Sequence, residues 1–135
     1  MEQEKQMIFH KFTEKAAKRL EEKKVRRYET LYVPSLDEQI KIRNLDYPEI
    51  VECTQVEEDE DPNAADKYTI YLAVVEPDLR QAAKELKDQG KITKYTDIVD
   101  IFELSEITEI AMEVLKLSKV IGNKKVEVVK ELKNS

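Results

Sequence analysis

The most apolar run in this polar chain covers residues 68 to 79. Apolar residues fill most positions up to Val75, so the pattern alone does not separate a buried helix from a buried strand. Asn63 and the two alanines after it supply a possible cap and helix formers, and Pro77 disfavours helical backbone at the residue before it. The run therefore predicts a buried helix over residues 64 to 75, with a buried strand as the open alternative.

Residues 5 to 24 are predicted to form a helix, because Phe9, Phe12, Ala16 and Leu20 recur at steps of three and four. The apolar stripe is narrow and most other positions are charged, so the helix gains little stability by itself and needs a surface to lie on. That surface belongs either to this domain or to another subunit. We favour a mobile arm or an oligomer contact over a core helix.

Two alternating segments follow and predict a β-hairpin. In residues 25 to 33, Leu31 and Val33 fall on one face and Tyr28 and Tyr32 on the other. In residues 39 to 43, isoleucines that point inward alternate with basic residues that point outward. The connection between the segments is rich in turn formers and has the length of a hairpin loop.

Two short helices are predicted on either side of the apolar run. Asp46 is placed to cap a helix that carries Pro48 in its first turn and extends to about residue 55. A polar helix from Asp78 to residue 89 follows Pro77, and Gly90 ends it. The apolar side of this second helix consists of Leu79, Ala82, Ala83 and Leu86.

Two more helices are predicted before residue 122. Thr93 or Thr96 begins the first, which packs through Ile98, Ile101 and Phe102. Ser105 caps the second, over residues 106 to 121, and Gly122 ends it. Its apolar stripe is formed by Ile107, Ile110, Val114, Leu117 and Ile121.

The chain has 135 residues, of which 41% are hydrophobic and 39% charged, so it suits one domain with a modest core. We expect an α+β fold that is mostly helical and contains one hairpin. Residues 1–24 form an N-terminal helical arm, 25–122 the core domain and 123–135 a lysine-rich tail that is either a frayed helix or disordered. The five adjacent carboxylates at 57 to 61 predict an exposed acidic loop over 57 to 63.

Charge and cysteine content narrow the class of protein. A net charge of -6 argues against a nonspecific grip on nucleic acid. The single cysteine, Cys53, excludes an internal disulfide and suits a reducing compartment. No apolar run approaches the roughly 18 residues that span a membrane, and the N-terminus lacks the apolar core of a signal peptide. These features predict a cytoplasmic protein.

Motifs that carry chemistry are sparse. The chain has two glycines, and they do not cluster, so it contains neither a glycine-rich phosphate-binding loop nor a dinucleotide-binding turn. One histidine and one cysteine exclude the common zinc sets, and we expect His10 on the surface and Cys53 in the core. The acidic run lacks the alternating oxygens and the glycine of a calcium loop. Glu76 and Asp78 are interpreted as turn and cap residues, so we predict no catalytic residue, cofactor or metal, and a protein that is not an enzyme.

Tyrosines and arginines of the hairpin allow two interpretations of one surface. Tyr28 and Tyr32 could stack on single-stranded nucleic acid with help from nearby arginines. Tyrosine and arginine are equally the favoured anchors of protein interfaces. The net charge of -6 favours a protein partner. The arginines concerned are Arg26, Arg27 and Arg43.

Several segments, in the same order, resemble the XkdN-like family of phage tail assembly chaperones. The segments are KKVRR (23 to 27), LYVPSL (31 to 36), IKIRNL (40 to 45), YLAVVEPDL (71 to 79), IVDIFELSEI (98 to 107) and residues 110 to 122. The resemblance therefore covers residues 23 to 122. Asp37 and Ser105 stand where the family often has glycine.

The resemblance implies a protein of a phage or prophage that acts in the host cytoplasm during tail assembly and is absent from the mature virion. Such chaperones are thought to coat the long tape measure protein and to help recruit tail tube subunits around it. The family offers no catalytic residues. The alternative is a small phage-derived nucleic-acid-binding regulator that uses the Tyr/Arg hairpin surface.

A chaperone for a long helical protein needs exposed apolar patches that cover the client's apolar seams, and surface charge that keeps the complex soluble. The candidate partner-binding residues are Phe9, Phe12 and Leu20 of the N-terminal helix and Tyr28 and Tyr32 of the hairpin. A homo-oligomer contact is a further use for the helix. The alternative for each residue is ordinary packing on the core.

Overall fold

The computed structural model describes residues 1–57, 61–122 and 126–129. It confirms a mostly helical α+β fold with a hairpin in the N-terminal half. The elements in chain order are α1 (Glu2–Lys23), β1 (Tyr28–Val33), β2 (Glu38–Arg43), α2 (Tyr47–Thr54), α3 (Ala64–Ala73), β3 (Val74–Glu76), α4 (Leu79–Asp88), the 3-10 helix η1 (Tyr95–Ile101) and α5 (Leu104–Leu117).

The predicted hairpin is present. β1 and β2 pair antiparallel along their whole length. Their inward residues, Val33, Ile40 and Ile42, are buried, and Tyr28 lies on the outward face. The connection places Asp37 at a φ of 49°. This left-handed backbone suits glycine and is tolerated by aspartate.

The apolar run at the centre of the chain forms a helix and then a strand, so the prediction of one helix to residue 75 is wrong beyond Ala73. Residues 74 to 76 pair antiparallel with β2 as a third strand, which gives the strand order β1-β2-β3. Val74 and Val75 are β-branched and favour a strand, and Pro77 disfavours helical backbone just before it. Glu76, expected in a turn, is part of this strand.

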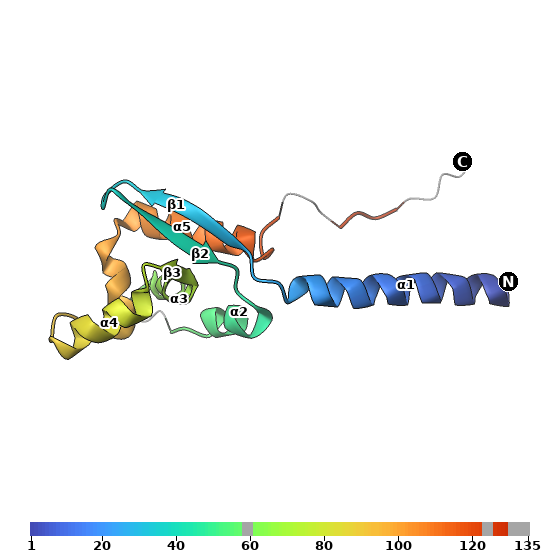
Figure 1. Ribbon diagram of the computed structural model, residues 1–135, viewed down its shortest axis with the longest axis horizontal. Helices are drawn as coiled ribbons and strands as arrows, with labels where there is room; N and C mark the ends of the chain where they lie inside the picture. The colour runs from blue at the N-terminus through green and yellow to red at the C-terminus, as the bar shows by residue number, and fades with distance from the viewer. Residues whose placement is uncertain (58–60, 123–125, 130–135) are drawn as a thin grey trace.

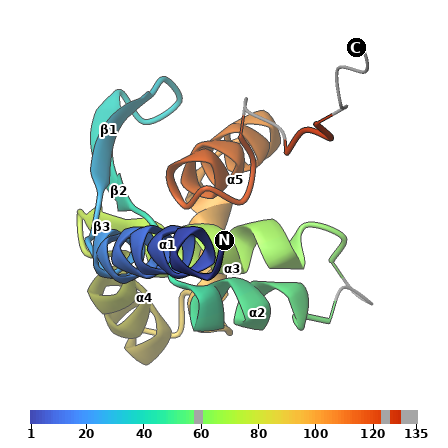
Figure 2. The same ribbon diagram turned by 90° about the vertical axis from the view of Figure 1, so that its right-hand side faces the viewer.

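The core lies where the sheet meets α3 and α5. Figure 2 looks along α1 and shows the hairpin on one side, with α5 and α3 on the other. α3 contacts α5, α2 and η1, so it occupies the middle of the core. The fully buried side chains include one from each of four elements, Ile42 of β2, Ile70 of α3, Val99 of η1 and Val114 of α5.

α2 and α4 begin at the predicted caps. The Asp46 carboxylate accepts a hydrogen bond from the Glu49 amide at 3.0 Å, and the Glu49 carboxylate accepts one from the Asp46 amide at 3.0 Å. Asp78 caps α4 by accepting from the Gln81 amide at 3.1 Å. Such a cap stabilises a helix by about 1 kcal/mol. Gly90 follows α4 with a φ of 73° and ends it as predicted.

η1 begins differently from the prediction. The Asp97 carboxylate accepts hydrogen bonds from the Thr93 and Lys94 amides at 3.2 and 2.9 Å. The capping side chain is therefore this aspartate and not a threonine. Ile98 is buried as expected, whereas Ile101 is exposed at the end of η1, where the chain turns into α5.

α5 starts earlier than predicted. The predicted cap was Ser105, but the helix begins at Leu104. The Glu106 carboxylate accepts a hydrogen bond from the Glu103 amide at 2.9 Å and satisfies a donor at the helix start. A glutamate in the first turn thus replaces the predicted serine cap.

α5 also ends earlier than predicted, at Leu117 and not at residue 121. Lys119 takes a left-handed φ of 64°, and its amide donates to the Lys116 carbonyl at 3.1 Å. This geometry terminates a helix. Gly122 therefore does not end α5, and Ile121 is exposed.

α1 projects from the core. Figure 1 shows it extending away from the sheet and from the other helices. It is 22 residues long and buries none of them. Residues 24 to 27 connect it to β1.

Two predicted segments lie partly outside the described residues. In the acidic loop, residues 58 to 60 are outside, Glu57 is exposed, and the Asp61 carboxylate meets the Lys67 ammonium at 2.5 Å. In the tail, the described residues 126 to 129 are exposed and have no regular structure. Within the described ranges, no helix combines the length and apolar character needed to cross a membrane.

Candidate partner-binding site

The N-terminal candidates share one face of α1. Phe9, Phe12 and Leu20 are 67%, 69% and 63% exposed. Steps of three and four residues place them in line along a helix, with Ile8 and Ala16 beside them. Large apolar side chains gathered on one exposed face mark an interaction surface. We call Ile8, Phe9, Phe12, Ala16 and Leu20 the α1 stripe.

Tyr28 and Tyr32 lie on the outward face of β1, and both are exposed. The Lys41 ammonium lies 5.4 Å from the centroid of the Tyr28 ring. The Tyr32 hydroxyl donates to the Asp37 carboxylate at 2.8 Å, which raises the pKa of Tyr32. Since α1 extends away from the sheet, the tyrosines and the α1 stripe form two separate surfaces (Figure 1).

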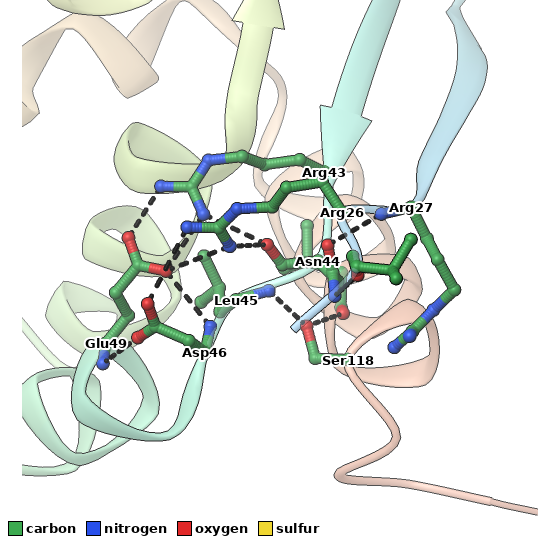
Figure 3. A network of polar contacts seen from close by, with 10 residues as sticks. Arg26, Arg27, Arg43, Asn44, Leu45, Asp46, Glu49 and Ser118 are labelled. Carbon is green, nitrogen blue, oxygen red and sulfur yellow. Dashed lines mark hydrogen bonds and ion pairs between the residues drawn. The ribbon is translucent and has the colours of Figure 1, made fainter. Parts of the chain in front are cut away.

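The root of α1 is held by Asn44, a polar residue that is 4% exposed. Its side-chain oxygen accepts from the Arg27 amide at 2.9 Å, and its side-chain NH2 donates to the Val25 carbonyl at 3.3 Å. The Asn44 amide donates to the Arg27 carbonyl at 3.0 Å. Residues 25 to 27 are therefore fixed to the end of β2, as Figure 3 shows.

Arg27 and Ser118 tie this connection to the end of α5. The Arg27 guanidinium donates from Nε and Nη2 to the Leu117 carbonyl at 3.2 and 2.6 Å. The last carbonyls of a helix lack partners within it and attract cations. The Ser118 hydroxyl accepts from the Leu45 amide at 2.8 Å and donates to the Val114 carbonyl at 2.7 Å.

Arg26 and Arg43 converge on the first turn of α2. Arg43 and Glu49 form a bidentate ion pair with distances of 2.9 and 2.6 Å. Arg26 reaches Glu49 at 3.4 Å and Asp46 at 3.6 Å. The hydrogen bonds from Arg43 lower the pKa of Glu49 to about 2. We call the whole network the α1 anchor, which comprises Arg26, Arg27, Arg43, Asn44, Asp46, Glu49 and Ser118 (Figure 3).

The α1 anchor uses the three arginines on which the nucleic-acid interpretation depended. Each of Arg26, Arg27 and Arg43 donates to a carbonyl or carboxylate of this chain. A surface for single-stranded nucleic acid needs cations that can meet phosphates. These contacts therefore favour a structural role for the three arginines.

A cavity of about 800 Å³ lies at the root of α1, where its last turn meets the start of α2 and the end of α5. Val25, Ile50 and Val120 give it apolar walls, and Tyr47 adds an exposed ring. Arg19, Glu22 and Lys23 of α1 line the same space. The cavity therefore combines apolar walls with charged side chains beside the exposed α1.

The remaining candidates lie where the sequence placed them. His10 is exposed on α1. Cys53 of α2 is buried, and burial raises the pKa of its thiol, as expected of an inert core cysteine. Within the described ranges, no group of three or more His, Cys, Asp or Glu is arranged to hold a metal ion.

Sequence reasoning missed the α1 anchor. Arg27 bonds to Leu117, which lies 90 positions away, and no local pattern connects the two. Asn44 follows an alternating strand as an ordinary loop residue would. Two of its parts had a visible signal: Asp46, which was predicted as the cap of α2, and the basic segment before β1, which we interpreted as part of a binding surface.

Comparisons of the chain with protein-family models, with curated proteins and with solved structures gave no match.

Proposed function

We propose that this protein is a phage or prophage tail assembly chaperone that binds the tape measure protein through the α1 stripe and assists assembly of the tail tube. One observation carries the proposal. A helix of 22 residues with no buried residue exposes Phe9, Phe12 and Leu20 along one face. An amphipathic helix of this kind pairs with the apolar seam of another helix through residues at steps of three and four.

The size of the α1 stripe suits transient binding. Full burial of one Ile, Phe or Leu side chain is worth about 1.5–3 kcal/mol, so the four large residues of the stripe contribute roughly 6–12 kcal/mol. Association itself costs on the order of 4–15 kcal/mol. One copy therefore holds its client weakly and is displaced when tail tube subunits cover the same seam. Such release agrees with a factor that is absent from the mature virion.

The segments that resemble the tail chaperones support the proposal independently of α1. They coincide with the hairpin, with α3 and β3, and with α5, which together build the core. Asp37 stands where the family often has glycine and takes a left-handed φ of 49°. Glycine adopts this conformation readily, so the family pattern and the backbone agree at this position.

The proposal predicts a long tape measure protein encoded by a neighbouring gene, and co-expression with that protein tests it. We expect the tape measure to become soluble and to elute with this protein in size-exclusion chromatography. Phe12→Gln should weaken the complex, since glutamine keeps helix propensity but removes the apolar ring from the stripe. Met7→Gln is the matched control, because Met7 is exposed on the opposite side of α1.

Two outcomes would contradict the proposal. The first is a tape measure protein that is no more soluble with this chain than without it. The second is a result in which Phe12→Gln and Met7→Gln weaken the complex to the same extent. The α1 stripe would then not be the surface that binds the tape measure protein. Retention on single-stranded DNA at physiological salt would favour the nucleic-acid-binding regulator instead.

A further inference from the structure

A groove between β1 and α5 combines an apolar floor with an acidic rim. Its volume is about 420 Å³. Its apolar floor consists of the half-buried Leu31, with the buried Val33 and Ile110 beneath. The carboxylates that line it are Glu29 of β1 and Glu106, Glu109 and Glu113 of α5.

The rim is anionic at neutral pH. Glu106 accepts hydrogen bonds from the Ser35 hydroxyl at 2.5 Å and the Ser35 amide at 3.0 Å, which lower its pKa. Glu109 is exposed, and Glu113 meets Lys116 at 3.5 Å in a solvent-exposed pair that neutralises little charge. The groove therefore attracts a partner that is apolar along one side and basic beside it.

The middle of α1 has this combination. Residues 5 to 20 contain Lys5, Lys11, Lys15, Lys18 and Arg19 against the single carboxylate of Glu14, a balance of +4 in a chain whose net charge is -6. Lys15 and Arg19 lie three and seven residues after Phe12, so they share its side of the helix. Basic side chains thus stand next to the apolar stripe.

The dimensions of the groove and of the α1 stripe match. The stripe from Phe9 to Leu20 is about 16 Å long at 1.5 Å per residue. The β1 wall from Glu29 to Pro34 is about 16 Å long at 3.3 Å per residue. The acidic rim on α5, from Glu106 to Glu113, extends over about two helical turns.

The α1 of the same chain does not reach this groove. The α1 anchor fixes residues 25 to 27 to β2 and α5, and α1 leaves the core in the direction seen in Figure 1. Folding back would require those contacts to break. A helix from another molecule can approach freely, because no residue of α1 lines the groove and α1 extends away from β1 and α5 in Figure 1.

We propose that the α1 stripe of a second copy of this chain docks in the groove between β1 and α5, and that the exchange is reciprocal. Lys15 and Arg19 then face Glu109 and Glu113 across each of two equivalent contacts, as in a two-fold dimer that exchanges an identical element. The dimer covers the same residues that we assign to the tape measure protein. It is therefore a client-free state in which the apolar stripe is shielded from solvent.

Charge reversal on the two sides tests the dimer without any client. Sedimentation equilibrium of the full chain over a concentration series should give a dimer. The double variants Glu109→Lys/Glu113→Lys and Lys15→Glu/Arg19→Glu should each weaken the dimer by about tenfold or more, because like charges then face one another. An equimolar mixture of the two variants should recover the dimer, since each altered surface meets its altered complement.

The control variant reverses the same number of charges as the groove variant, but on α4. Glu85→Lys/Asp88→Lys alters two exposed carboxylates of α4, outside the groove, and should leave the dimer unchanged. Circular dichroism confirms that each variant is folded. Recovery in the mixture excludes misfolding as the cause of dissociation.

Three outcomes would overturn the inference: a wild-type chain that stays monomeric across the series, groove variants that dimerise like the wild type, or a mixture that does not recover. All are measured without the tape measure protein. Failure of this inference is therefore distinguishable from failure of the proposed function, which is read from the solubility and elution of the client.

Discussion

The Arg43–Glu49 ion pair at the α1 anchor makes part of the stability dependent on pH. Its side chains are 12% and 17% exposed, so solvent screens the pair little. Hydrogen bonds from Arg43 lower the pKa of Glu49 from 4.5 to about 2. The unfolded state therefore binds a proton more readily than the folded state. The pair stabilises the fold above pH 4.5, and this contribution is lost as the pH falls toward 2.

Glu49→Gln should lower the free energy of unfolding by about 3 kcal/mol near neutral pH, as the pKa difference implies. Urea unfolding at several pH values measures this difference between variant and wild type. We expect it to shrink as the pH falls below 4.5. A difference that stays constant down to about pH 2 would show that lost packing, and not charge, is the cause. Glu85→Gln on exposed α4 is the control and should show no difference at any pH.

Lys119 stores backbone strain at the end of α5. Its φ of 64° is left-handed, a conformation that costs an ordinary residue about 1 kcal/mol and costs glycine little. We expect Lys119→Gly to raise the free energy of unfolding by about 0.5–1 kcal/mol. Lys116→Gly, one turn earlier and helical, should lower it by about 1 kcal/mol. Equal effects of the two substitutions would contradict this assignment of strain.

At the scale of elements, α3 and α1 represent opposite extremes of burial. Ile70 of α3 has no exposed surface, whereas Ile8 of α1 is largely exposed. Ile70→Ala should destabilise the fold by about 2–5 kcal/mol through a cavity in the core. Ile8→Ala should change stability by less than about 0.5 kcal/mol. A comparable loss in both variants, measured by chemical denaturation, would show that α1 packs on the chain in solution.

Elements with a local signal could be predicted from the sequence. The hairpin followed from the alternation around Leu31 and Ile40, and α2 followed from the Asp46 cap with Pro48 in the first turn. Those signals work because strand alternation and helix capping are determined by neighbouring residues. α4 was predicted for the same reason, with Gly90 at its end.

Elements determined by distant contacts were mispredicted. β3 is three residues long and exists because β2 offers an edge to it, which periodicity does not reveal. α5 ends at Leu117, whose carbonyl Arg27 binds from the far end of the chain, so Gly122 was a misleading signal. The candidate site also has one part with a local sequence signal and one part determined by distant contacts. The α1 stripe was visible in its spacing, whereas the α1 anchor depended on tertiary pairing.

At the scale of the whole molecule, the α1 anchor fixes the segment from which the exposed helix α1 leaves the core. The anchor joins the end of β2, the start of α2 and the end of α5 at the root of α1 (Figure 3). Fixing this segment restricts the orientations of α1, and a restricted helix loses less conformational entropy on binding than a free arm. Residues 5 to 20 of α1 also carry a balance of +4 on a chain of net charge -6, and such a local separation of charge orients partners before contact.

Amide hydrogen exchange tests most directly whether α1 is the surface that binds the client. The Glu109→Lys/Glu113→Lys variant is the appropriate chain, because we expect its groove to compete less with the client for the α1 stripe. We predict fast exchange for residues 8 to 20 in the isolated variant and strong protection of the same residues in complex with the tape measure protein. A complex that protects only the core and leaves the exchange of α1 unchanged would contradict the account.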